Sequence, residues 1–111
     1  MSNIEEYTEK TFESIKHIDE YGNEFWEARE LMPLLEYSKW ENFHKVIKRA
    51  MIACETSNNK VSDHFPEFRK MVDIGSKTKR ETIDYRLSRY ACYLIVQNAN
   101  PRKKSVALGQ T

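Results

Sequence analysis

The side chains best suited to contact nucleic acid lie between Ser38 and Cys54. Four hydrogen-bonding residues recur at intervals of three or four positions and would share one face of a helix, namely Ser38, Asn42, Lys45 and Arg49. Asparagine suits the edge of adenine, and lysine or arginine suits guanine. The opposite stripe is apolar and has the spacing of a buried helix face, with Trp40, Phe43, Ile47, Ala50, Met51 and Cys54. The pattern predicts a helix over 38–54, capped by Ser38, that meets DNA through its basic face.

A basic β-hairpin is predicted downstream of this helix. The hydrophobic period changes to two over residues 71–87, which is typical of paired strands. The connecting loop, residues 75–80, carries the bases Lys77, Lys79 and Arg80. A hairpin with a basic loop that follows two helices is typical of the wing of a winged helix. We therefore expect these three bases to contact the DNA backbone beside the groove.

A third group of cations follows Asn100 and Pro101, which have the order of a helix cap and a first helical residue. It consists of Arg102, Lys103 and Lys104. The helix dipole disfavours positive charge at that position, so a role in binding phosphate would explain why it is tolerated. Lys39 and Lys48, which flank the basic face of the helix over 38–54, are expected at the edges of the groove.

The charges are segregated along the chain, although the formal net charge is only +1. Residues 1–36 contain ten acids and three bases, a net charge of −7, and residues 37–111 contain seven acids and fifteen bases, a net charge of +8. A chain of this kind can present one basic face to a polyanion while its overall pI stays ordinary. The charge pattern favours DNA as the partner.

Two alternatives to duplex binding are open at this point. The acidic first helix could bind a basic groove on a recombinase or a repressor, which would make the chain a protein-interaction regulator. The six tyrosines raise the second alternative, in which exposed rings stack on the bases of a single strand. Against stacking, the hydrophobic pattern predicts that Tyr85, Tyr90 and Tyr93 point inward.

Caps, breakers and hydrophobic periods predict the order of the elements. Helical spacing covers residues 2–18, 27–35, 38–54 and 89–98. Phe25 and Trp26 form a short extended stretch, and an irregular segment is expected around Phe65 and Phe68. These elements predict an α+β domain that is mainly helical and winged-helix-like, with a small antiparallel β-hairpin. The last residues lack a cap, so we expect the single domain of residues 1–111 to be an N-terminal fragment of a longer protein.

Two helix ends have specific signals. Ser88 can cap the helix over 89–98, which is apolar nearly all round and is therefore expected in the middle of the domain. Pro33 lacks an N–H group and should kink the helix over 27–35 or end it early.

The spacing of reactive side chains disfavours enzyme classes. His17, His44 and His64 are isolated from one another and from the cysteines, unlike zinc ligands. The three glycines are scattered and form no phosphate-binding loop. Ser76 and Lys79 match the S-x-x-K motif by letter, but they lie in the predicted hairpin loop without its supporting motifs. No catalytic residue, metal or cofactor is expected.

Cysteine usage and hydropathy indicate the compartment. Cys54 and Cys92 are far apart in sequence and lie inside apolar helical patterns, which predicts reduced, buried thiols. No apolar signal region begins the chain, and no run approaches the length of a membrane span. We therefore expect a cytoplasmic protein with no membrane partner.

Three runs of sequence resemble a known family. They cover residues 26–31 leading to Leu35, Tyr37 and Trp40, then residues 84–95, and finally residues 97–103. Together they resemble the amino-terminal domain of the DNA-damage-inducible protein D (DinD) family, which is similar to the BRO-type domain of phage and viral antirepressors. In one departure, Glu36 stands where a glycine is expected before Tyr37, which predicts a wider turn between the two helices.

The resemblance implies a bacterial, cytoplasmic protein made in the response to DNA damage, the SOS response, with a BRO-like domain that binds DNA and no known catalytic chemistry. It also implies that the protein continues beyond residue 111. The partner it implies is a DNA strand, a recombinase filament, or both. The residues leave open whether the DNA is single or double stranded and whether the domain pairs with a second copy.

Overall fold

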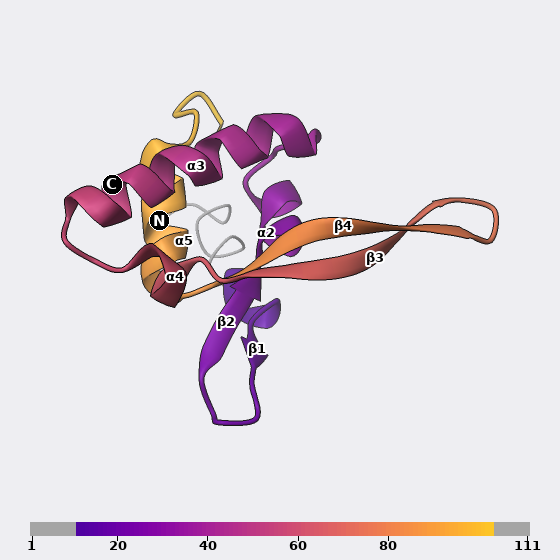
Figure 1. Ribbon diagram of the computed structural model, residues 1–111. Helices are drawn as coiled ribbons and strands as arrows, with labels where there is room; N and C mark the ends of the chain where they lie inside the picture. The colour runs from indigo at the N-terminus through magenta and orange to yellow at the C-terminus, as the bar shows by residue number, and fades with distance from the viewer. Residues whose placement is uncertain (1–10, 104–111) are drawn as a thin grey trace.

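The computed structural model describes residues 11–103 and contains a four-stranded antiparallel sheet. Its order is β1-β2-β4-β3, formed by β1 (His17–Ile18), β2 (Glu24–Glu27), β4 (Thr78–Leu87) and β3 (Glu67–Gly75). Trp26 of β2 pairs with Leu87 of β4, and both side chains are buried. Strands β3 and β4 form a long ribbon that extends away from the helices (Figure 1).

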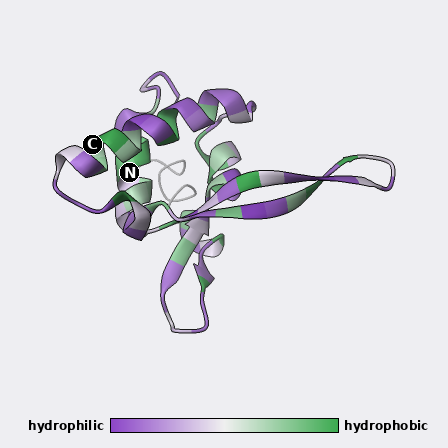
Figure 2. Ribbon diagram, viewed as in Figure 1, coloured by the Kyte–Doolittle hydropathy of each residue, from purple (hydrophilic) through white to green (hydrophobic). Residues whose placement is uncertain are grey.

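The helices are α2 (Ala28–Leu34), α3 (Trp40–Thr56), the short α4 (Val61–His64) and α5 (Arg89–Asn98). Helix α3 crosses α5, and the core lies where these two helices meet the root of the sheet (Figure 1). Its largest fully buried side chains include Trp26, Phe43, Ile47 and Ile95. In Figure 2 the outer side of α3 is mostly hydrophilic, whereas α5 is more hydrophobic. Helix α5 buries Ala91, Cys92, Leu94 and Ile95 but exposes Arg89, Tyr93 and Gln97, so it packs through one broad face and the prediction that it lies in the middle of the domain is wrong.

Several predicted elements are confirmed. The α+β class, the extended stretch at Phe25 and Trp26, and the helix over 89–98 are all present. The Ser88 side chain accepts a hydrogen bond from the N–H of Ala91 at 3.0 Å, as expected of a helix cap. Cys54 and Cys92 are buried free thiols, and burial raises the pKa of both.

The prediction that the first helix runs to Ile18 is wrong, because His17–Ile18 form strand β1 and pair with Glu24 and Phe25. A tight turn makes this pairing possible. The Asp19 carboxylate accepts hydrogen bonds from the N–H groups of Tyr21 and Asn23, both at 2.9 Å. Within the predicted helix, residues 11–14 are helical. Residues 2–10 of the predicted helix lie outside the described residues.

Three other expectations need correction. The N-cap of α3 is Lys39 and not Ser38, which lies one residue earlier. The Lys39 side chain makes no capping hydrogen bond. Phe68 lies within β3 rather than in an irregular segment, because its strand pairs with β4 as far as Glu67. The hairpin is not small, because β3 has nine residues and β4 has ten, which makes them the longest strands of the sheet. The description "mainly helical" therefore gives the strands too little weight. The winged-helix likeness therefore stays a hypothesis.

The end of α2 explains how Glu36 replaces the expected glycine. The helix ends at Leu34, one residue after Pro33, in agreement with the expected early end. The N–H of Tyr37 then bonds to the carbonyl of Met32 at 3.1 Å, and that of Glu36 to Pro33 at 3.0 Å. This is a Schellman cap, which needs a left-handed residue at Glu36, and its φ is 65°. The turn is therefore tight rather than wide.

Replacing Glu36 with glycine is expected to stabilise the fold by about 0.5–1 kcal/mol. A side chain in the left-handed region is strained, and this gain exceeds the extra freedom that glycine has in the unfolded chain. Urea denaturation of Glu36→Gly measures the change. The control is Lys45→Gly at an exposed position inside α3, which is expected to lose about 1 kcal/mol. Equal losses in both variants would show that Glu36 is not strained.

Candidate nucleic-acid interface

The outer face of α3 presents the predicted cations to solvent. Asn42, Lys45, Lys48 and Arg49 are all exposed, and so are Ser38 and Lys39 just before the helix. The inner face buries Phe43, Val46, Ile47, Ala50 and Cys54. The predicted sidedness is thus confirmed, although Trp40 and Met51 are only partly buried. The helix therefore packs through one side and leaves the basic side free to meet a ligand.

The chain after α5 lies along the first half of α3 and adds cations to the same surface (Figure 1). The Arg49 Nη2 donates to the carbonyl of Asn98 at 3.1 Å, and Lys103 Nζ donates to the carbonyl of Glu36 at 2.6 Å. The N–H of Asn100 also donates to the Tyr37 hydroxyl at 3.0 Å. These contacts bring Arg102 and Lys103 beside the start of α3, whereas Lys104 lies outside the described residues.

Arg49 and Lys103 both donate to carbonyls at the ends of helices. Asn98 is the last residue of α5 and Glu36 follows the end of α2, so each carbonyl belongs to a helix C-terminus, where positive charge is stabilised. Arg49 uses one of five guanidinium N–H donors in this contact and can still bind a phosphate with the others. Two exposed acids border the surface. Glu36 lies beside Lys103, and Glu41 lies four residues before Lys45, at the spacing of a helix ion pair.

His44 joins α3 to the root of the ribbon. Its Nε2 is 2.8 Å from the Tyr85 hydroxyl, and its ring stacks on Trp40 with centroids 5.1 Å apart. Burial lowers the pKa of His44, and the nearby charges of Lys48 and Arg29 lower it further, against a small opposing effect of Glu67. The imidazole is therefore neutral at neutral pH, and the positive charge here comes from Lys48 and Arg29.

Arg29 extends the basic surface from α3 to the ribbon, and the sequence analysis missed it. Its Nε donates to the carbonyl of Ile83 at 3.0 Å, and its Nη2 donates to the Thr82 hydroxyl at 2.7 Å. Its guanidinium lies 4.0 Å from the centroid of the Trp40 ring. Burial lowers the pKa of Arg29, the Asp84 carboxylate raises it, and the charge of Arg80 lowers it again. One sequence signal could have identified Arg29: it is the single arginine among the acidic residues 1–36.

The three hairpin bases do not share one loop. Only Ser76 and Lys77 form the turn, and Lys77 has a φ of 60°. Lys79 lies opposite Asp73 and Arg80 lies opposite Val72, so both belong to β4. Neighbouring residues of a strand point to opposite faces, so Lys79 and Arg80 do too. The predicted loop is wrong because pairing continues as far as Thr78 and leaves a two-residue turn.

Asp84 anchors this arrangement from inside the fold. Its side chain has no exposed surface, and its Oδ1 accepts hydrogen bonds from the N–H groups of Tyr85 at 2.8 Å and Arg29 at 3.1 Å. Lys70 Nζ lies 3.4 Å from its Oδ2 and 2.6 Å from Glu27 Oε1. Burial raises the pKa of Asp84, whereas the two N–H groups and Lys70 lower it. The carboxylate thus ties the start of α2 to both strands of the ribbon.

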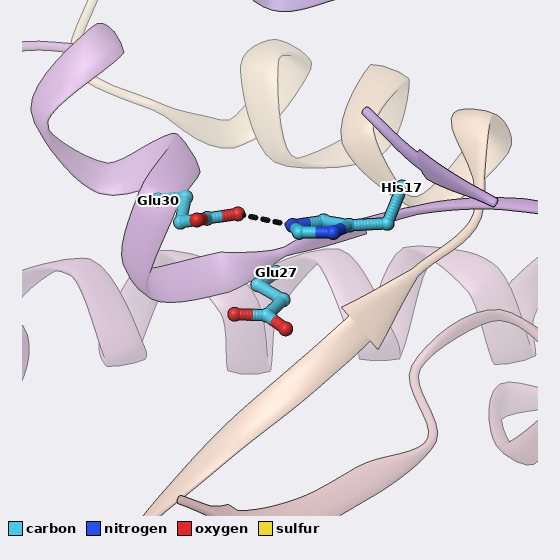
Figure 3. Close-up of side chains that lie close together, drawn as sticks. All are labelled: His17, Glu27 and Glu30. Atoms are coloured by element: carbon cyan, nitrogen blue, oxygen red, sulfur yellow. Dashed lines mark hydrogen bonds and ion pairs between the residues drawn. The ribbon is translucent and has the colours of Figure 1, made fainter. Parts of the chain in front are cut away.

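His17, Glu27 and Glu30 lie close enough to resemble a metal centre, with one ligand atom of each within 4.8 Å of the others. Their contacts are already made within the protein. His17 Nε2 faces Glu30 Oε1 at 2.6 Å, and the Glu27 carboxylate points away from both (Figure 3). Glu27 Oε1 instead accepts a hydrogen bond from Lys70 Nζ at 2.6 Å. The Lys70 ammonium already forms an ion pair with the Glu27 carboxylate, and its positive charge disfavours binding of a metal ion there. The His17–Glu30 contact therefore joins β1 to α2, and the Glu27–Lys70 ion pair joins β2 to β3.

The acids of the first third are also largely paired. Arg89 donates to Glu24 at 2.8 and 3.0 Å and to Glu13 at 2.9 Å, and these bonds to Arg89 are the largest cause of the lowered pKa of both acids. Glu27 and Glu30 have the partners described above. Four acids of the first third thus have partners within the fold, whereas Glu5, Glu6 and Glu9 of the predicted acidic helix lie outside the described residues.

The tyrosines are placed only partly as expected. Tyr85 is buried and Tyr90 is half-buried, but Tyr93 is 58% exposed, so the prediction that it points inward is wrong. Tyr93 lies on α5, in an exposed position among buried neighbours. Within residues 11–103, no helix is long and apolar enough to cross a membrane.

Comparison with known proteins decides the family. Residues 14–108 match the N-terminal domain of the BRO family. The chain belongs to that family. It is also 52% identical over 100 residues to DNA damage-inducible protein D of Escherichia coli (strain K12). The matched region covers 90% of this BRO domain and 36% of that relative, so the chain spans about a third of the relative's length. No solved structure matches it.

Proposed function

We propose that this BRO domain is the non-catalytic DNA-binding module of a bacterial DNA-damage response protein. The observation that carries the proposal is the exposed basic face of α3, extended on one side by Arg102 and Lys103 and on the other by Lys48 and Arg29. A surface of this kind binds DNA by neutralising phosphates and releasing counterions. Membership of the BRO family and the similarity to a DNA damage-inducible protein support the same role.

Each part of the surface has a proposed role. Asn42, Lys45 and Arg49 meet base edges in the groove, and Lys39 and Lys48 contact its edges. Lys77, Lys79 and Arg80 contact the flanking backbone, in the manner of a wing, and residues 102–104 form another phosphate-binding run. Phosphate contacts fix the register without reading sequence, so we expect modest sequence preference.

The protein-interaction alternative has less support. It needs an acidic surface on the N-terminal helix, and within the described residues Glu13 and Glu24 are paired with Arg89 and Glu27 with Lys70. Contact with a recombinase filament, or pairing with a second copy, would draw on surfaces and segments beyond this interface. Single-strand binding is supported by two exposed tyrosine rings in the described residues, those of Tyr21 and Tyr93.

Fluorescence anisotropy with single- and double-stranded oligonucleotides of matched length tests the proposal. Saturable binding to the duplex, tighter than binding to the single strand, is expected at low salt. Tighter binding to the single strand would favour stacking on exposed rings. If neither DNA binds while a protein partner does, the acidic alternative replaces the proposed function.

A further inference from the structure

The outer half of the β3–β4 ribbon, residues 71–81, contributes no residue to the buried core of the described fold. All of its residues are exposed except Val72, which is half-buried, whereas Asp84 and Tyr85 at the root of the ribbon are buried. Figure 1 shows this outer half extending beyond the helices and the other strands. At about 3.3 Å per residue it reaches about 15 Å beyond the root, which is enough to enter a DNA groove.

Apolar side chains are exposed on this arm. Met71 is 57% exposed and Ile74 is 55% exposed. Ile74 is also the extra residue of a β-bulge, because Asp73 pairs with Lys79 and Gly75 pairs with Thr78. A bulge bends its strand and re-aims the side chain that it carries. The strand thus presents an isoleucine to solvent near the end of a projecting arm.

The charged residues near Ile74 indicate which kind of partner binds this part of the arm. Lys77, Lys79 and Arg80 follow within six residues, and the charge of Arg80 reaches Arg29, which borders α3. Residues 71–81 also contain Asp73 and Glu81, so three bases against two acids leave the arm with a net charge of +1, and the three bases lie together around its tip. This excess of positive charge favours a polyanion as the partner. Pairing of its free edge with another strand is disfavoured by the charged Arg69 and Asp73 on β3.

We propose that this arm bends DNA, with Ile74 inserted between two base pairs of the duplex held by α3. An apolar wedge of this kind unstacks one base step and kinks the double helix, while neighbouring cations bind the phosphates on either side. The proposal rests on the proposed function and adds a second activity to it, which is deformation of the bound DNA.

Energy transfer between dyes at the two ends of a short duplex tests the proposal. Saturation with the unaltered chain is expected to raise the transfer efficiency, because bending brings the ends together. Ile74→Ser is expected to abolish that rise while weakening binding less than about tenfold, since the cations remain. Ile74→Leu is expected to retain the bend.

Ile18→Ser is the matched control, because Ile18 is 59% exposed on β1, at the opposite edge of the sheet. It is expected to bind and bend DNA as the unaltered chain does. Saturable binding without a rise in transfer, or an unchanged rise in Ile74→Ser, would overturn the bending arm and leave the proposed function standing. Absence of any binding would remove both. Anionic vesicles serve as a second probe: if Ile74→Ser loses vesicle binding and still bends DNA, the arm is a membrane contact instead.

Discussion

Replacing Lys45 and Lys48 with glutamate is expected to weaken duplex binding by about a hundredfold or more, equivalent to about 2.7 kcal/mol. Each substitution removes a cation and places a carboxylate against the polyanionic DNA. Both side chains are exposed, so the free energy of unfolding is expected to change by less than about 0.5 kcal/mol per site. Anisotropy titrations at one low salt concentration measure the binding, and thermal melting checks the fold.

A matched control separates the effect of where a charge lies from the effect of the net charge. Lys60 is an exposed lysine after the end of α3, so Lys60→Glu changes the net charge as Lys45→Glu does. Lys60→Glu is expected to weaken binding only slightly. If both single variants lose the same affinity, the basic face of α3 is not the interface.

Removing the carboxylate of Asp84 is the substitution with the largest expected effect on stability. Asp84→Ala is expected to lower the free energy of unfolding by about 2–4 kcal/mol, because it leaves two backbone N–H groups without their buried acceptor and removes one of the two carboxylates that Lys70 contacts. Urea denaturation followed by circular dichroism measures this loss. Asp84→Asn keeps an oxygen for the N–H groups and is expected to lose less.

Asp73→Ala is the control, because Asp73 is an exposed acid on the same ribbon. Its expected change in stability is less than about 0.5 kcal/mol. A loss below about 1 kcal/mol in Asp84→Ala would contradict the role given to the buried carboxylate, since unpaired buried groups cost more than that.

Local signals predicted the elements whose contacts are local. The spacing of Phe43, Ile47 and Ala50 was enough to orient α3, because the same face of a helix repeats every three or four residues. Ser88 was a readable cap for the same reason, since its partner Ala91 is three residues away. The exposed basic face follows from the buried one and needs no knowledge of the rest of the fold.

Long-range pairing accounts for what the sequence did not reveal. Arg29 and Asp84 are 55 residues apart, and only the pairing of β2 with β4 brings them together. Strand β1 is two residues long, so it carries no period that could distinguish it from the end of a helix. The left-handed Glu36 was hidden because a residue other than glycine occupies a position that usually requires glycine.

The salt dependence of duplex binding shows whether the exposed cations of α3 form the DNA interface. If about five of the cations around α3 neutralise phosphates, the logarithm of the binding constant falls with the logarithm of salt concentration with a slope of about −4 to −5. Anisotropy titrations between about 50 and about 200 mM salt cover the range in which this slope is measured. A slope near zero would contradict an interface built on the exposed cations of α3.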